Sequence, residues 1–168
     1  MTQVEANSVA AILSFLLRAL FWAAIVIGLV SAFTIVSAAV TGEPIPFPGD
    51  RGAELSRPAA PIAALIAISV FSGGIAFISD QLRRILSTLA SGDPFVPENA
   101  TRLMRIAGAI ALVEIIRNIG YVLLVSLTEA QVDYDFHIGA WIAVVILFVL
   151  AQVFREGTRL REESQMTI

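Results

Sequence analysis

The sequence predicts an all-α, polytopic membrane protein with four transmembrane helices in an antiparallel bundle and a helical hairpin on the cytoplasmic side. Hydrophobic residues make up 57% of the 168-residue chain, which exceeds the usual share in a soluble domain. Four apolar runs are each close to the roughly 17 to 25 residues that cross hydrocarbon as a helix. The runs are 19–40, 61–79, 106–127 and 138–154. None alternates polar with apolar residues as the strands of a membrane barrel do, so we expect helices in a single membrane domain.

The first run ends in small residues, Ser37, Ala38 and Ala39, that resemble a signal-peptide cleavage site. However, the segment 1–8 has no basic residue and carries Glu5, and the run is longer than the apolar core of a signal peptide. We therefore expect this run to be retained as a membrane span.

The placement of arginine predicts the orientation of the chain. All eleven positive charges are arginines, and eight of them flank the spans on one side. These eight are Arg18, Arg83, Arg84, Arg102, Arg105, Arg155, Arg159 and Arg161. The outer segments hold only Arg51 and Arg57. Because cytoplasmic segments of membrane proteins are enriched in Lys and Arg, we expect both termini, the hairpin 80–105 and the tail 155–168 in the cytoplasm.

The two longer connections differ in character. Five of the seven prolines lie in or next to the outer loop 41–60, which predicts an extended, irregular connector or a docking surface for an external ligand. In the hairpin, Leu82, Ile85 and Leu89 continue the helical spacing of the second span. The helix should stop at 91–94 (Ser-Gly-Asp-Pro), and a new helix should begin near Pro97.

Three polar residues interrupt the third span: Glu114, Arg117 and Asn118. A projection at 100° per residue places them on one face with Ala107, Ala111 and Tyr121, and we expect this face to point into the protein. Two interpretations remain open for Glu114 and Arg117. They form an ion pair that fixes the register of the helices, or Glu114 exchanges a proton or the pair opens to accept a ligand.

Small residues line one face of each of the first two spans, and such narrow faces let helix backbones approach closely in an antiparallel bundle around the third span. They are Ala24, Gly28 and Ala32 in the first span and Ser69, Ser72, Gly73 and Ala76 in the second.

No pattern points to a catalytic, cofactor-binding or metal site. Asp133, Asp135 and His137 alternate and could meet at a metal ion, but His137 is the only histidine and the chain has no cysteine. Glu114 has no histidine near it in sequence, so general acid–base chemistry has little support and we expect a non-enzyme without cofactor. The basic residues are too few and too close to the membrane for direct nucleic-acid binding.

The hairpin and the tail carry short motifs that resemble a family of bacterial membrane proteins. These are Leu82-Arg83-Arg84-Ile85, Gly92-Asp93-Pro94-Phe95, Glu98-Asn99 with Leu103, and the tail 153–163 (Val-Phe-Arg-Glu-Gly-Thr-Arg-Leu-Arg-Glu-Glu). Together with the hydrophobic layout they resemble the domain of unknown function 2975 family. The resemblance implies a small four-span protein of the bacterial inner membrane that is often the partner of a small helix-turn-helix regulator.

The leading functional hypothesis is a non-enzymatic membrane regulator or sensor that binds a cytoplasmic protein, with membrane lipid as a second partner. Its candidate interaction residues are Arg83, Arg84, Gly92, Asp93, Pro94, Phe95, Asn99, Arg155, Gly157 and Arg159. The same motifs could instead serve packing, with Phe95 folded back on the hairpin and Leu160 and Met166 docked under the bundle. One alternative is an immunity protein against a membrane-active peptide toxin, a bacteriocin. Another is a small transporter acting as a homo-oligomer, with Glu114 carrying coupling protons.

Overall fold

The computed structural model describes residues 3–43, 59–128 and 136–165, and every element in these ranges is an α-helix. The helices are α1 (Gln3–Thr41), α2 (Ala59–Ala90), α3 (Pro97–Thr128) and α4 (Ile138–Gln165). Each contains a stretch that is long and apolar enough to cross a membrane. The predicted class, an all-α multi-pass membrane protein, is confirmed, and each helix extends beyond the apolar run that predicted it.

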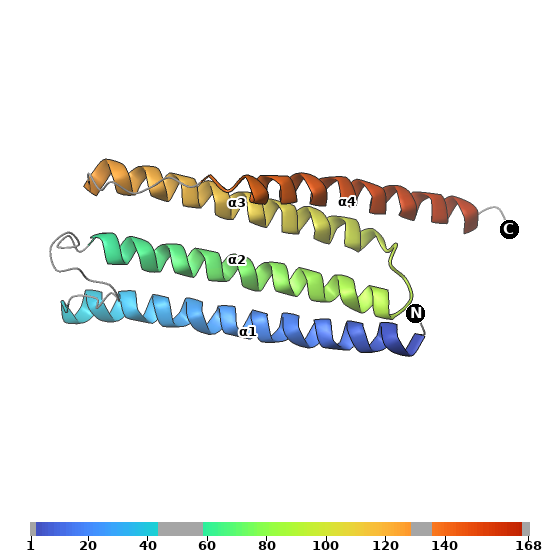
Figure 1. Ribbon diagram of the computed structural model, residues 1–168, viewed down its shortest axis with the longest axis horizontal. Helices are drawn as coiled ribbons and strands as arrows, with labels where there is room; N and C mark the ends of the chain where they lie inside the picture. The colour runs from blue at the N-terminus through green and yellow to red at the C-terminus, as the bar shows by residue number, and fades with distance from the viewer. Residues whose placement is uncertain (1–2, 44–58, 129–135, 166–168) are drawn as a thin grey trace.

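The four helices lie in a row in chain order, and successive helices run in opposite directions (Figure 1). Within the described residues, contacts join only α1 with α2, α2 with α3, and α3 with α4. The row is therefore open, and the predicted bundle around the third helix is not confirmed. An apolar helix has several faces suited to a neighbouring helix, so composition alone does not determine which helices meet.

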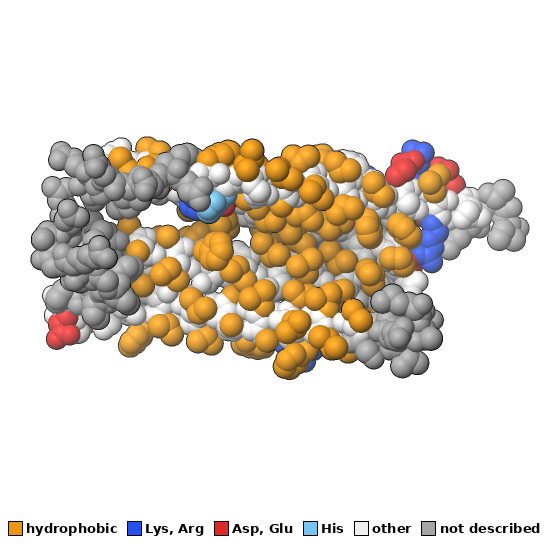
Figure 2. Space-filling view, viewed as in Figure 1, with side chains coloured by type: hydrophobic (Ala, Val, Ile, Leu, Met, Phe, Trp, Pro, Cys, Tyr) orange, Lys and Arg blue, Asp and Glu red, His pale blue; other side chains and the backbone are white. Residues whose placement is uncertain are grey.

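Because the row is open, many apolar side chains are exposed on the surface of the molecule. Phe15, Phe33, Leu112 and Val145 are among many large hydrophobic side chains that are more than half exposed. Figure 2 shows hydrophobic side chains over most of the length of the molecule, with the largest group of acidic and basic side chains at one end. This distribution fits a protein whose middle is surrounded by hydrocarbon.

The contact between α1 and α2 uses several of the small residues that form narrow faces in the sequence. Ala24, Ser72 and Ala76 are buried, and a Cβ placed on Gly28 would lie 3.6 Å from the Ser72 Cβ. Ala32 is the exception, since it is exposed.

At the contact between α2 and α3, the glycine in close contact is Gly74 rather than the predicted Gly73. Gly73 borders open space, whereas a Cβ on Gly74 would lie only 2.8 Å from Val113 Cγ2. Because α2 packs on two helices at once, it needs two narrow faces, and a single stripe described only one of them.

The turn between α2 and α3 ends the second helix as predicted. Gly92 adopts φ +82°, and the N–H groups of Gly92 and Asp93 bond to the carbonyls of Leu89 and Thr88 at 3.1 and 3.0 Å. This is the Schellman pattern, in which glycine takes the left-handed conformation at little steric cost. We call the end of the row that contains this turn the hairpin end.

Helix α4 is displaced along α3. It begins beside the middle of α3 and continues past the hairpin end (Figure 1). His137, just before α4, lies 3.6 Å from Glu114 of α3, and Thr158 of α4 reaches the turn at Phe95. Twenty residues of helix, about 30 Å, separate these two contacts. We call residues 155–165, the part of α4 after its apolar run, the α4 extension.

Candidate functional site

Two polar clusters are candidate sites, and the first lies in the middle of α3. Glu114 is 8% exposed, and its Oε2 accepts hydrogen bonds from Arg117 Nε at 3.0 Å and Nη2 at 2.8 Å. Asn118 Nδ2 donates to the Glu114 carbonyl at 2.7 Å. The predicted inward face is confirmed at Ala107 and Glu114, which are buried, while Leu112 on the opposite face is exposed.

The second carboxylate oxygen of Glu114 faces a histidine that is distant in sequence. His137 Nδ1 lies 3.6 Å from Glu114 Oε1. This is too long for a direct hydrogen bond but short enough for an ion pair if His137 is protonated. Glu114 therefore has no histidine near it in sequence, but the fold brings His137 close to it. Asp133 and Asp135, the other members of the predicted metal trio, lie outside the described residues.

The geometry of this first cluster agrees with a structural ion pair. Two N–H groups of Arg117, on Nε and Nη2, donate to one oxygen of Glu114. The two residues stand three apart on one helix, which makes the pair easy to form. The guanidinium on one carboxylate oxygen and the imidazole near the other also agree with the alternative interpretation, in which Glu114 exchanges a proton. Among the described residues, no group of three or more potential metal-binding side chains is present.

The second cluster joins the turn at the hairpin end to α3. Asn99 is fully buried, and its Nδ2 donates to Thr88 Oγ1 at 2.6 Å and to the Pro94 carbonyl at 2.9 Å. Its Oδ1 accepts a hydrogen bond from Arg102 at 2.8 Å. Asn99 was a candidate for contact with a partner, but its side chain is occupied in holding the end of α2, the turn and α3 together.

The same turn is fastened to the α4 extension. Thr158 Oγ1 lies 2.9 Å from the Phe95 carbonyl and also 2.9 Å from the Phe154 carbonyl of its own helix, so its single proton is shared between the turn and α4. Arg161 forms an ion pair with Asp93. The Phe95 ring lies over Gly157, where a Cβ would come within 2.8 Å of the ring. Phe95 also contacts Phe154, with ring centroids 5.6 Å apart. We call this set of contacts the turn clamp.

The turn clamp gives separate roles to the residues of the two motifs. Phe95 packs on α4 rather than back on its own hairpin. Leu160 is 56% exposed and so is not docked under the helices, and Met166 lies outside the described residues. Arg155 and Arg159 are exposed, and Arg159 pairs with Glu156 and Glu163 of its own helix.

The two arginines of α2 also differ. Arg83 lies over the Phe21 ring of α1, 5.9 Å from its centroid, and shares Asp80 with Arg84. Arg84 Nε bonds to Asp80 Oδ2 at 2.7 Å and its side chain is 58% exposed. Arg83 therefore links α1 and α2, whereas Arg84 remains accessible.

Sequence reasoning missed Thr158 and Arg161 as partners of the turn, and it missed His137 as a neighbour of Glu114. Each contact joins residues more than 20 positions apart across a connection of unknown path. The one available signal was the presence of motifs in both the turn and the tail, which suggested a shared role but not a shared contact.

Comparison with known proteins assigns the chain to a family. No curated protein and no solved structure matches the chain. The model of a family described as "protein of unknown function (DUF2975)" matches residues 47–168, which include the whole of α2, α3 and α4. The chain belongs to this family, as its motifs predicted.

Proposed function

We propose that the protein is a non-enzymatic regulator or sensor of the bacterial inner membrane that binds a cytoplasmic protein at its hairpin end. The observation that carries this proposal is the turn clamp. It joins Phe95 and Asp93 to Thr158 and Arg161 across 63 and 68 residues of chain, so that two separate segments form one surface.

The charge distribution supports a cytoplasmic hairpin end. Eight of the eleven arginines lie in α1 before its apolar run, in the hairpin or in the α4 extension. Arginine in short segments beside membrane spans favours the cytoplasmic side. In this orientation the α4 extension projects from the membrane as a continuous helix.

The outward face of the α4 extension supports a protein partner. Leu160 is 56% exposed although it lies in a charged stretch of helix, and Glu156 and Glu163 are its charged neighbours on that helix face. An exposed apolar side chain with charged residues around it is a usual feature of protein contacts, where a buried centre is surrounded by a polar rim. The resemblance described above suggests a small helix-turn-helix regulator as the partner.

The test is capture of the tagged full-length protein from mild detergent, comparing two double variants. Arg159→Ala with Leu160→Ala is expected to lose a recurrent cytoplasmic protein that the unmodified chain retains. Arg18→Ala with Leu16→Ala removes the same two residue types from α1, where both are exposed, and should retain it. Absence of any recurrent partner, or equal loss in both variants, would refute the proposal.

The immunity and transporter hypotheses stay predictions. The narrow contact between α1 and α2 is already filled by the two helices, so it offers no vacant face for a peptide toxin. The proximity of Glu114 to His137 supports the hypothesis that Glu114 carries coupling protons. Transport across vesicle membranes that depends on Glu114 would favour the transporter.

A further inference from the structure

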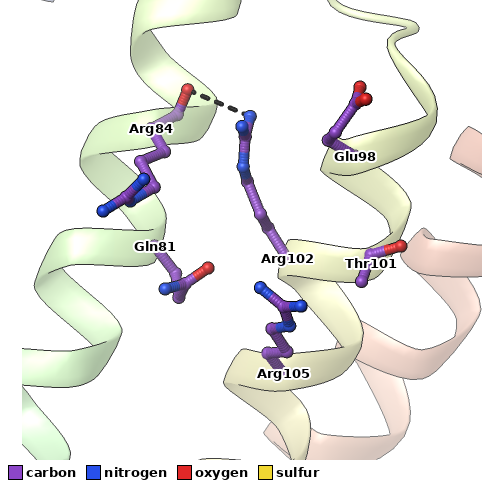
Figure 3. A pocket seen from close by; sticks show the side chains of 6 residues that line it. All are labelled: Gln81, Arg84, Glu98, Thr101, Arg102 and Arg105. Carbon is purple, nitrogen blue, oxygen red and sulfur yellow. Dashed lines mark hydrogen bonds between the residues drawn. The ribbon is translucent and has the colours of Figure 1, made fainter.

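A basic cavity opens between α2 and α3 at the hairpin end, apart from the turn clamp. Its volume is about 330 Å³, and it is lined by Gln81, Arg84, Glu98, Thr101, Arg102 and Arg105. Figure 3 shows Arg102 and Arg105 extending from α3 into the gap, with the Gln81 carboxamide opposite them on α2. Three guanidinium groups therefore meet a single carboxylate, that of Glu98, in the wall of this cavity.

The positive charge of the cavity is only partly offset. Arg84 pairs with Asp80, but Arg102 bonds to two neutral oxygens, the Arg84 carbonyl at 3.4 Å and Asn99 Oδ1 at 2.8 Å. Neither Arg102 nor Arg105 forms an ion pair with a carboxylate in the part of the chain that the structure describes. Guanidinium groups in such a position suit the oxygens of a phosphate group.

A buried polar group in the same wall also needs a partner. Gln81 is 6% exposed, and its Oε1 is buried with no hydrogen-bond partner among the described residues. Buried polar atoms are nearly always paired, so a donor from outside the chain is expected here. A ligand that carries both phosphate oxygens and a hydroxyl group meets the needs of the arginines and of Gln81 together.

The surface beside the cavity is apolar and continues toward the middle of the helices. Phe77 lies one turn from Gln81 on α2 and is 43% exposed, and Leu112 lies two turns from Arg105 on α3 and is 57% exposed. Gly73 and Gly108, on the same two faces, border open space. We call these four residues the apolar strip.

We propose that the basic cavity binds the headgroup of an anionic membrane phospholipid whose acyl chains lie along the apolar strip. A free phosphate ion would satisfy the arginines but would leave the apolar strip uncovered, so the combination favours a lipid. Basic pockets between membrane helices on the cytoplasmic side are suited to such headgroups. This binding does not depend on a protein partner, so it can hold even if the proposed function fails.

The test uses native mass spectrometry of the full chain released from bilayers that contain equal amounts of phosphatidylglycerol and phosphatidylcholine. Phosphatidylglycerol should be retained preferentially. Arg102→Gln with Arg105→Gln should lower its retention about 30-fold, since each arginine beside an anionic bilayer contributes roughly fivefold. Arg155→Gln with Arg159→Gln removes two charges from the α4 extension and should leave retention unchanged.

Arg105→Gln alone controls for misfolding of the double variant, because Arg105 is exposed, whereas Arg102 also bonds to Asn99. It should lower retention about fivefold. Equal retention of the two lipids, or equal loss in the cavity and α4-extension variants, would overturn the proposal. Displacement of the lipid by added inorganic phosphate would assign the cavity to free phosphate and overturn the choice of lipid.

Discussion

The Glu114–Arg117 pair and the turn clamp are built in opposite ways. The cluster in the middle of α3 pairs Glu114 with Arg117, three residues away on one helix, while the turn clamp joins Phe95 to Thr158 across 63 residues. A local pair forms whenever its helix forms, whereas a long-range contact requires the helices to be assembled. The Glu114–Arg117 pair therefore depends on α3 alone, whereas the turn clamp depends on the docking of α4.

The largest expected effect is the loss of one partner from the local pair. Glu114→Leu leaves Arg117 without its carboxylate and should destabilise the protein by about 2 to 3 kcal/mol, below the usual range for a buried pair because the Arg117 side chain is 31% exposed. SDS titration in mixed micelles measures the change. Glu114→Leu with Arg117→Leu should recover part of the loss, because neither member of this pair is then left without the other. If the double variant is no more stable than Glu114→Leu, the ion-pair interpretation is wrong.

The next effect belongs to the turn. Asn99→Ala removes the donor and the acceptor that join Thr88, Pro94 and Arg102, and should cost about 2 kcal/mol. The same titration measures it. Ser87→Ala is the control, since Ser87 donates to a carbonyl of its own helix at an exposed position and its loss should cost about 0.5 kcal/mol. An equal cost at both positions would contradict the special role of Asn99.

A smaller effect distinguishes two opposing contributions at Gly157. Replacement by Ala gains about 1 kcal/mol in helix propensity but forces the Phe95 ring to move from 2.8 Å, at a typical cost of about 1 to 3 kcal/mol. We expect a net loss of up to about 2 kcal/mol in thermal unfolding experiments. Gly120→Ala in α3 borders open space and should stabilise the protein instead. Stabilisation by Gly157→Ala would mean that the turn clamp is loose.

The smallest effect is that of the exposed ion pair. Arg161→Gln should cost between about 0.2 and 1 kcal/mol, because its contact with Asp93 lies at the surface and competes with water and salt. Unfolding in low and in high salt measures this contribution, which should shrink in high salt. Thr158→Val, which removes a hydrogen bond to a carbonyl, should show no such salt dependence. A salt-independent loss for Arg161→Gln would assign its effect to packing.

The sequence predicted the features that depend on local chemistry. The helix stop at Gly92, the restart at Pro97 and the inward face around Glu114 all follow from residues within one or two turns of each other. The open row, the use of Gly74 in place of Gly73 and the approach of His137 to Glu114 do not. They depend on how helices slide along one another, and apolar faces of similar composition do not specify that displacement.

The displacement of α4 has an electrostatic consequence for Glu114. A helix that begins beside the middle of another brings its unpaired N–H groups, and a partial positive charge of about half a unit, to that point. Hydrogen bonds from Ile138 to the Phe136 carbonyl at 2.8 Å and from Ala140 to the His137 carbonyl at 3.0 Å satisfy part of this end. The Glu114 carboxylate, 3.6 Å from His137 just before this helix end, carries the sign of charge that a helix start favours.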